Sequence, residues 1–374
     1  WSLKTIYDVI ATLKGSQYPD QWVVRGNHHD GWVFGASDPL SGQTALLAEA
    51  KALGQMAKAG WKPKRTIVYT SWDAEEPMLL GSTEWAEDHA DELKKKAIVY
   101  INSDGNGRGI LNVGGSEDLS KFVSDTLAGL KDPETGQSVD ARRRAKLRMA
   151  GPMADEHDRA MGRQAADASK NMPLEPLGSG SDYSAYLQHL GLATLDYGYG
   201  GEGRSSGVYH SRYDTYEHHS NFVDPGFVYD ALLAKTVGRA VIKAADTDLP
   251  IQQASDFADA IGQYVGEVKR LADTRRTAAE TQKKNLADNV YALAADPTKP
   301  HANPTPLLEV PKFDFAPLDQ AEAKLKASAK AYDDALAANG SRLSGTDLAR
   351  LQGLMQSIGQ TLLLEKGLPF REWY

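Results

Sequence analysis

The sequence predicts an α/β protein with a mostly parallel central sheet flanked by helices, followed by a C-terminal helical domain. Short apolar runs alternate with segments of helical periodicity, which is the pattern of parallel strands joined by crossover helices. After Pro250 the chain is rich in Ala, Lys and Asp and keeps only helical periodicity. We therefore expect two domains, residues 1–250 and 251–374, with the boundary at Asp246–Pro250, "DTDLP".

The first elements follow from apolar alternation and from turn residues. Residues 5–13 and 21–25 alternate like strands and are separated by turn residues, which predicts a hairpin. A helix is expected to begin at the N-cap residue Ser41 and to stop at Gly60. The next elements in order are a strand over 66–72, a helix over about 82–96 and a strand over 97–102.

The second half of the chain is increasingly helical. The expected elements are a short strand near 110–113, a helix around 119–130, a solvated surface helix pair within 140–170, a glycine loop and helix within 175–191, and a helix over 225–245. From Ile251 the tail has the pattern of a helical bundle, broken only at Ala295–Pro306. This tail is expected to serve packing or dimerisation.

Composition limits the chemistry that is available to the chain. Its 374 residues are 41% hydrophobic and 25% charged, as in ordinary soluble globular proteins. There is no cysteine, so disulfides and thiolate ligands are excluded, and any metal must be held by His, Asp and Glu. The formal charge of -8 argues against a nucleic-acid partner, and no apolar run approaches the length of a membrane span.

Metal-type side chains follow three of the predicted strands. One strand ends at Asn27-His28-His29-Asp30, the next at Asp73-Ala74-Glu75-Glu76, and a third at Asp104. In parallel sheets, ligands bind beyond the carboxyl ends of the strands. Each group alone could be the solvated start of a loop, and His28 could be a core histidine, but their convergence favours a metal site.

Two divalent metals can share five such ligands if one carboxylate bridges them. The set is completed by two residues distant in sequence, and it comprises His28, Asp38, Glu76, Asp104 and His210. The motifs that contain these residues are "HHDGWVFGASDPLSG", "TSWDAEEPMLLGSTEWAE", "YINSDG", "PLGSGSD" and "YHSRYDTYE". Together they resemble the di-zinc peptidases of the glutamate carboxypeptidase II (prostate-specific membrane antigen) and transferrin-receptor family, over roughly residues 5–220.

The resemblance implies a role for each ligand. Asp38 would bridge two zinc ions, with His28 and Asp104 on one ion and Glu76 and His210 on the other. Asp38 also lies in the turn signal "SDPLSG", so it can serve both purposes.

The resemblance also implies roles for residues that do not bind the metals. Glu75 would be the general base, because neighbours in an extended segment point in opposite directions. Asp30 would orient a ligand imidazole, and Tyr209 would hydrogen-bond the oxyanion, although packing is an equal alternative for Tyr209. Gly178, Gly180 and Ser181 would line the substrate cleft, unless "GSGS" is a simple hinge.

The sequence also departs from this family. Where acidic-dipeptide-cleaving members carry arginines, this chain has Gly114 and the segment Thr194–Tyr199, so an acidic preference is in doubt. No counterpart of the family's protease-associated domain or of its C-terminal lysine loop is apparent, so a fragment is expected. Glu84 and Glu87 match positions that help to hold calcium in the family, but a solvated helix face is an equal alternative.

The leading hypothesis is a zinc-dependent carboxypeptidase that acts on small peptides or N-acylated dipeptides. An aminopeptidase on the same metal core is the first alternative. The second is a non-catalytic protein similar to the transferrin receptor, but the retention of all five ligands and of Glu75 argues against it. The resemblance further implies a homodimer formed through the helical domain, and it favours a secreted or periplasmic location.

Overall fold

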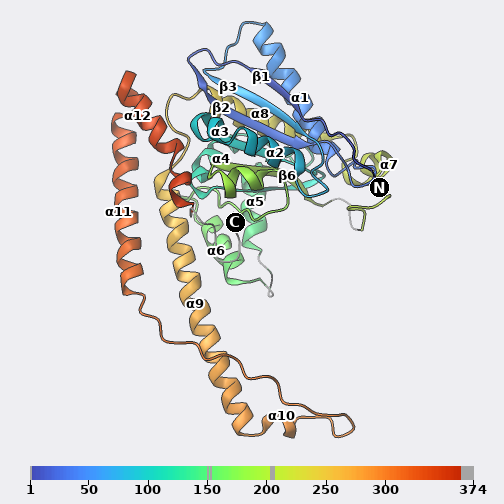
Figure 1. Ribbon diagram of the computed structural model, residues 1–374, viewed down its shortest axis with the longest axis vertical. Coiled ribbons are helices and arrows are strands. Elements are labelled where there is room, and N and C mark those ends of the chain that lie inside the picture. Colours follow the sequence, from blue (N-terminus) through green and yellow to red (C-terminus); the bar gives the residue numbers. More distant parts are fainter. Residues whose placement is uncertain (1, 150, 152–153, 203–206, 364–374) are drawn as a thin grey trace.

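The structure is a computed structural model that describes residues 2–149, 151, 154–202 and 207–363. Its centre is a six-stranded sheet with the order β1-β3-β2-β4-β6-β5 (Figure 1). The strands are β1 (Val9–Leu13), β2 (Tyr18–His28), β3 (Arg65–Trp72), β4 (Ala97–Ser103), β5 (Gly109–Gly115) and β6 (Thr194–Gly201). The four inner strands run parallel, and the edge strands β1 and β5 are antiparallel to their neighbours. The predicted α/β fold with a mostly parallel sheet is confirmed.

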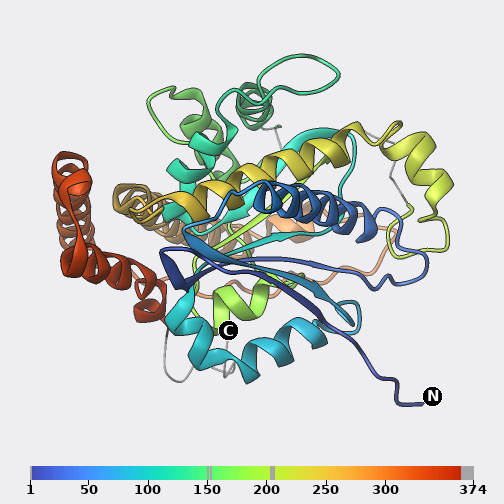
Figure 2. The same cartoon turned by 90° about the horizontal axis from the view of Figure 1, so that it is seen from above.

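Helices cover both faces of the sheet, as Figure 2 shows. On one face α1 (Leu40–Lys58) and α8 (Val228–Asp246) bury their apolar sides against the strands. On the other face α2 (Leu80–Asp88) and α3 (Ala90–Lys96) pack over a cluster that includes Trp72 and Tyr100. Core clusters therefore lie on both faces of the sheet and enclose its middle. Strands that are buried on both faces are typically apolar runs. The edge strand β1, which is exposed along most of its length, and the ends of the inner strands reach solvent.

Three local predictions differ from the structure. Strands β1 and β2 do not form a hairpin, because β1 pairs with β3 and leaves β2 two places away. The helix expected over 82–96 is two helices that meet at His89. Helix α1 has Pro39 rather than Ser41 at its N-cap, and the Ser41 hydroxyl instead donates to the Ser37 carbonyl.

The remaining segments of the body connect the later strands and lead into α8. They are η1 (Glu117–Leu119), α4 (Ser120–Leu127), α5 (Val139–Arg148), α6 (Glu156–Ala166), η2 (Ala185–His189), α7 (Tyr216–His218) and η3 (His219–Val223). Helices α5 and α6 form the predicted pair, but α5 is not a purely solvated helix. Its Arg143 is buried and donates to the carbonyls of Leu111 and Val113, which anchors α5 to β5.

The C-terminal part is helical, as expected. Its segments are α9 (Ala254–Ala287), α10 (Val290–Leu293), α11 (Ala316–Asn339), η4 (Gly340–Arg342), α12 (Gly345–Gln356) and η5 (Gly359–Leu362). Helices α9 and α11 lie side by side and project from the body (Figure 1). The chain then returns, because the Gln356 side chain donates to the Ala97 carbonyl at 3.1 Å. None of the helices in the described residues is both long and apolar enough to cross a bilayer.

Candidate metal centre

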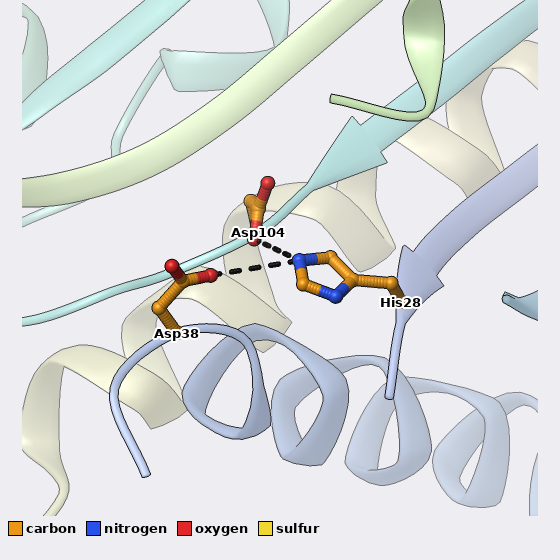
Figure 3. A group of neighbouring side chains, drawn as sticks. All are labelled: His28, Asp38 and Asp104. Atoms are coloured by element: carbon orange, nitrogen blue, oxygen red, sulfur yellow. Dashed lines mark hydrogen bonds and ion pairs between the residues drawn. The ribbon is translucent and has the colours of Figure 1, made fainter. Parts of the chain in front are cut away.

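The five predicted metal ligands meet at the carboxyl edge of the sheet. His28 ends β2 and Asp104 follows β4, which is the neighbouring parallel strand. Glu76 lies in the turn after β3, Asp38 precedes α1, and His210 comes from the loop after β6. His28 Nε2 lies 2.7 Å from Asp104 Oδ1 and 3.5 Å from Asp38 Oδ1 (Figure 3). Strand ends thus supply three of the five residues.

The two oxygens of Asp38 face different imidazoles. Asp38 Oδ1 points toward His28 Nε2. Asp38 Oδ2 lies 3.2 Å from His210 Nε2, which is itself 2.9 Å from Glu76 Oε2. Two groups result, His28–Asp38–Asp104 and Asp38–Glu76–His210, and within each group the ligand atoms lie within 4.8 Å of one another. Asp38 is the residue that the two groups share.

The donor atoms fit a pair of divalent cations. Imidazole nitrogens and carboxylate oxygens, without thiolates, suit zinc and the harder divalent metals. Burial alone would lower the pKa of His28, but hydrogen bonds to Asp104, Asp30 and Asp38 raise it far above its usual range. The carboxylates therefore attract a proton onto the imidazole at the place where a cation would balance their charge. An excess of carboxylates over imidazoles is stable only with added positive charge.

Asp30 serves two neighbouring parts of this centre. The His28 Nδ1 atom lies 3.0 Å from the Asp30 carbonyl and 3.3 Å from its carboxylate, which leaves Nε2 to face the ligands. The Asp30 carboxylate also accepts hydrogen bonds from the backbone N–H groups of Glu75 and Glu76, at 3.0 and 3.2 Å. Asp30 therefore contacts both the His28 imidazole and the backbone of the turn that carries the two glutamates.

Glu75 and Glu76 face different histidines, although the segment that carries them is a turn and not the extended chain on which the prediction was based. Glu76 faces His210, while Glu75 Oε2 lies 3.8 Å from His28 Nε2. Burial, opposed by the charge of His28 and reinforced by Asp104, raises the pKa of Glu75 to about 8. The preceding Ala74 has φ 57°, a left-handed conformation that turns the chain sharply after β3.

The His210 ring stacks with two aromatic rings. The Trp32 ring stacks on it at 5.4 Å between centroids, and the Tyr209 ring stacks at 3.7 Å. The φ of His210 is 54°, a strained conformation that persists where surrounding contacts enforce it. Tyr209 is 71% exposed, and it borders a 290 Å³ cavity that Asp38 and Asp104 also line. The Tyr209 side chain is therefore accessible next to two of the predicted ligands.

The other predicted substrate-binding residues, Gly180 and Ser181, do not line the cavities that border the ligand cluster. Gly180 is exposed and has a φ of 128°. Ser181 is buried, and its hydroxyl accepts a hydrogen bond from the Asn102 amide at 3.0 Å. Neither residue lines the 290 Å³ cavity or the 630 Å³ cavity that also borders Asp104.

The sequence interpretation overlooked two residues that hold Asp38 in place. The Asp214 carboxylate accepts the backbone N–H groups of Ser37 at 2.8 Å and Asp38 at 3.1 Å. The Ser37 hydroxyl lies 2.9 Å from His219 Nδ1, and His219 Nε2 lies 3.1 Å from Asp230 Oδ2. Asp214 belongs to the quoted motif "YHSRYDTYE", which was the available signal; nothing in the spacing pointed to His219.

A third group of metal-type side chains is a hydrogen-bonded network. His219, Asp224 and Asp230 are buried together. Both ring nitrogens of His219 have partners, and Asp224 accepts the backbone N–H groups of Tyr229 and Asp230. We interpret this group as a support for the loop that carries Asp38, because its polar atoms are already paired.

Comparison with known proteins identifies relatives of the chain. The model of "Peptidase family M28" matches residues 8–223. The mouse protein "Aminopeptidase NAALADL1" is 30% identical over 302 residues, covering 78% of this chain and 38% of that protein. The "Probable glutamate carboxypeptidase" of Arthroderma benhamiae is 35% identical over 269 residues, covering 71% of this chain and 34% of that protein. The chain thus spans little more than a third of the length of these relatives.

Among solved structures, an aminopeptidase from Aneurinibacillus sp. strain AM-1 is 23% identical, with a TM-score of 0.41. The match covers 64% of this chain and 48% of that one.

Proposed function

Because the chain belongs to peptidase family M28, we propose that it is a zinc-dependent exopeptidase, principally a carboxypeptidase acting on small peptides or N-acylated dipeptides. The observation that carries this proposal is the position of Asp38, with one oxygen toward His28 and the other toward His210. A carboxylate between two imidazole–carboxylate groups is an arrangement that suits a pair of metal ions.

His28 and Asp104 would hold one zinc ion, Glu76 and His210 the other, and Asp38 both. When bound, the zinc ions supply Lewis acidity and make water acidic enough to be deprotonated near neutral pH. Asp30 keeps the imidazole of His28 oriented and fixes the backbone of both glutamates through its carboxylate. The positions of these side chains are therefore set before substrate binds.

Glu75 would remove the proton from the attacking water and return it to the leaving amine. It lies beside the ligands without belonging to either ligand group, and it is held by a backbone hydrogen bond to Asp30. A buried carboxylate with a raised pKa is suited to accept a proton and release it again. Tyr209 would donate its hydroxyl hydrogen bond to the oxyanion from the open side of the cluster.

Hydrolysis of a small peptide panel tests this proposal directly. N-acetylated and free-amine dipeptides are incubated with added zinc, and again with a chelator. Cleavage of the acetylated peptides that the chelator abolishes is the expected result. If only free-amine peptides are cut, the aminopeptidase alternative is correct; zinc binding without any cleavage would favour a non-catalytic protein.

A calcium site at Glu84 and Glu87 has less support. Both carboxylates are exposed on α2, and neither belongs to the metal-type groups found among the described residues. Calcium would be expected to raise the melting temperature of the wild type but not of the Glu84→Gln/Glu87→Gln variant. Equal effects on both proteins would remove this site from the proposal.

We also propose a homodimer in which the helical part, residues 251–374, forms the contact. Helices α9 and α11 project from the body, and α9 leaves Val268 and Leu271 more than half exposed. Light scattering should give twice the chain mass for the wild type. A Val268→Glu/Leu271→Glu variant should give a single chain mass, and a dimer that survives this change would place the interface elsewhere.

A further inference from the structure

A large cavity adjoins the proposed metal centre on the side of Asp104. It has a volume of about 630 Å³ and lies beside the 290 Å³ cavity that contains Asp38 and Tyr209. Both cavities are lined by Asp104, Gly105, Tyr199, Gly200 and Gly201. A Cβ atom added at Gly200 would meet no atom of the described residues within 4 Å, so these residues leave the boundary between the cavities open at this point. A peptide whose carbonyl lies at the metal ligands can therefore extend into the larger cavity.

Asp196 borders this larger cavity one strand away from Asp104. It lies on β6 opposite Asn102 of β4, and Asp104 follows Asn102 by two residues. The Asn102 amide donates to Asp196 Oδ1 at 3.0 Å and to the Ser181 hydroxyl at 3.0 Å. The neighbouring strand thus fixes the position of the carboxylate, which is only partly exposed.

Asp196 has no cationic partner among the residues that the structure describes, because no Lys, Arg or His nitrogen of theirs lies within 4 Å of its carboxylate. Arg143 also lines the cavity, but it donates to the carbonyls of Leu111, Val113 and Pro173 and lies 3.9 Å from Glu175.

Among the described residues, the other charged side chains that line the larger cavity are Glu175, which lies near Arg143, and two exposed side chains of opposite charge, Lys146 and Asp158. The latter two offset each other, and the charge of Arg25 acts on Asp196 only from beyond ion-pairing distance, so among the described residues Asp196 is a carboxylate without an ion-pair partner beside the predicted metal ligands. A partly buried carboxylate gains most when a cation pairs with it away from bulk water.

We propose that Asp196 binds a positively charged group of the peptide substrate, which extends from the metal centre into the 630 Å³ cavity. This inference rests on the proposed exopeptidase function and assigns its charge preference. The charge can come from a free α-amine or from a lysine or arginine side chain, and both present the same ammonium-type chemistry to the carboxylate. A substrate residue with an acidic side chain would be repelled from this position.

The test compares Asp196→Asn with the wild type on three peptides. These are a neutral N-acetylated dipeptide, the same dipeptide with a free amine, and an N-acetylated dipeptide with lysine before the scissile bond. Asparagine keeps the oxygen that accepts from Asn102, so the fold should be retained. We expect kcat/KM to fall about 10- to 100-fold for at least one cationic peptide and to change less than about twofold for the neutral one. The peptide that is affected identifies the source of the charge.

Asp158→Asn is the matched control, because Asp158 lines the same cavity but is exposed. An equal loss for all three peptides, no loss for any, or the same selective loss in Asp158→Asn would overturn the role of Asp196. Zinc content is measured for each variant to confirm that the metal centre is intact.

A second experiment separates this inference from the proposed function. Calorimetry measures peptide binding to Glu75→Gln and to the same variant that also carries Asp196→Asn. If the wild type cuts no peptide, but Asp196→Asn still weakens the binding of cationic peptides, then the exopeptidase proposal fails and the assignment of Asp196 stands. If binding of cationic and neutral peptides is weakened equally, the assignment fails whatever the activity.

Discussion

Adjacent acids in one turn can have separate roles because their side chains diverge. Glu76 Oε2 lies 2.9 Å from His210, whereas Glu75 lies near His28, outside both ligand groups. The Asp30 carboxylate accepts both of their backbone N–H groups, so the turn is held from one point. The two glutamates differ in the histidine that each side chain faces. Changing each glutamate alone tests whether they also differ in role.

Glu75→Gln should keep the bound zinc and lose turnover. The amide has nearly the same size but cannot accept the proton of water, so we expect kcat to fall by at least about 10²- to 10⁴-fold. Steady-state kinetics with zinc analysis on the same sample measures both quantities. Glu76→Gln is the paired control and should lose zinc; turnover that persists in Glu75→Gln would remove the proposed base.

Asp214→Asn should weaken metal binding although Asp214 belongs to neither ligand group. Each of its two oxygens accepts one backbone N–H, from Ser37 and Asp38, and an asparagine amide nitrogen cannot accept the second. Loss of such support around a metal ligand typically costs about 10- to 100-fold in metal affinity. Competition with a zinc chelator measures the change. Asp167→Asn, in an exposed turn, is the control and should leave the affinity unaltered.

At the scale of elements, helix α1 is packed directly against the site. A Cβ atom at Gly42, in its first turn, would lie 1.9 Å from the Asp104 carbonyl and 2.5 Å from Asn27 Oδ1. Glycine at this position therefore lets the helix approach the ends of β2 and β4. The positions of two predicted metal ligands, Asp38 before α1 and Asp104 after β4, depend on that close approach.

The contrast between two glycines of α1 gives a matched pair of variants. Gly42→Ala should lower the free energy of unfolding by about 1–3 kcal/mol, because backbone atoms must shift. Gly54→Ala, at a position where an added Cβ meets nothing within 4 Å, should raise it by about 0.5–1 kcal/mol. Urea unfolding of both variants measures the effect, and equal changes would contradict the close packing at Gly42.

Much of the fold was predictable at this scale, and the errors have physical causes. Apolar runs such as Thr66–Trp72 and the following ligands identified the parallel strands and their carboxyl edge. The hairpin prediction was wrong because alternation in 5–13 and 21–25 cannot tell which strand pairs with which. Asp214 and His219 were overlooked because they act on backbone groups and on Ser37, contacts that exist only once the chain is folded.

At the scale of the whole molecule, the body and α9 meet at a group of buried acids. The Tyr264 hydroxyl of α9 donates to Glu117 at 3.0 Å, and the backbone N–H of Gln253 donates to the Asp118 carbonyl at 2.7 Å. Burial raises the pKa of Glu117 to about 7 and that of Asp118 to about 7. The Asp118 Oδ1 atom is buried without a hydrogen-bond partner among the described residues. Ionisation at this junction is therefore costly.

The junction should make the stability of the protein depend on pH. The folded chain binds these two protons more tightly than the unfolded chain, so the free energy of unfolding falls as pH rises from about 4 to about 7. A Glu117→Gln/Asp118→Asn variant lacks both ionisations. Between pH 5 and pH 8 it should gain at least about 1 kcal/mol relative to the wild type. Urea unfolding at the two pH values measures this, and parallel behaviour of the two proteins would contradict it.

The central claim is that five side chains, brought together from five separate segments, hold two metal ions. Native mass spectrometry of the zinc-equilibrated chain counts those ions most directly. The account predicts two zinc ions per chain in the wild type and in Glu75→Gln, and fewer in His28→Ala and His210→Ala. A wild-type chain that takes up one zinc ion or none, or two that survive the loss of His28 and His210, would contradict it.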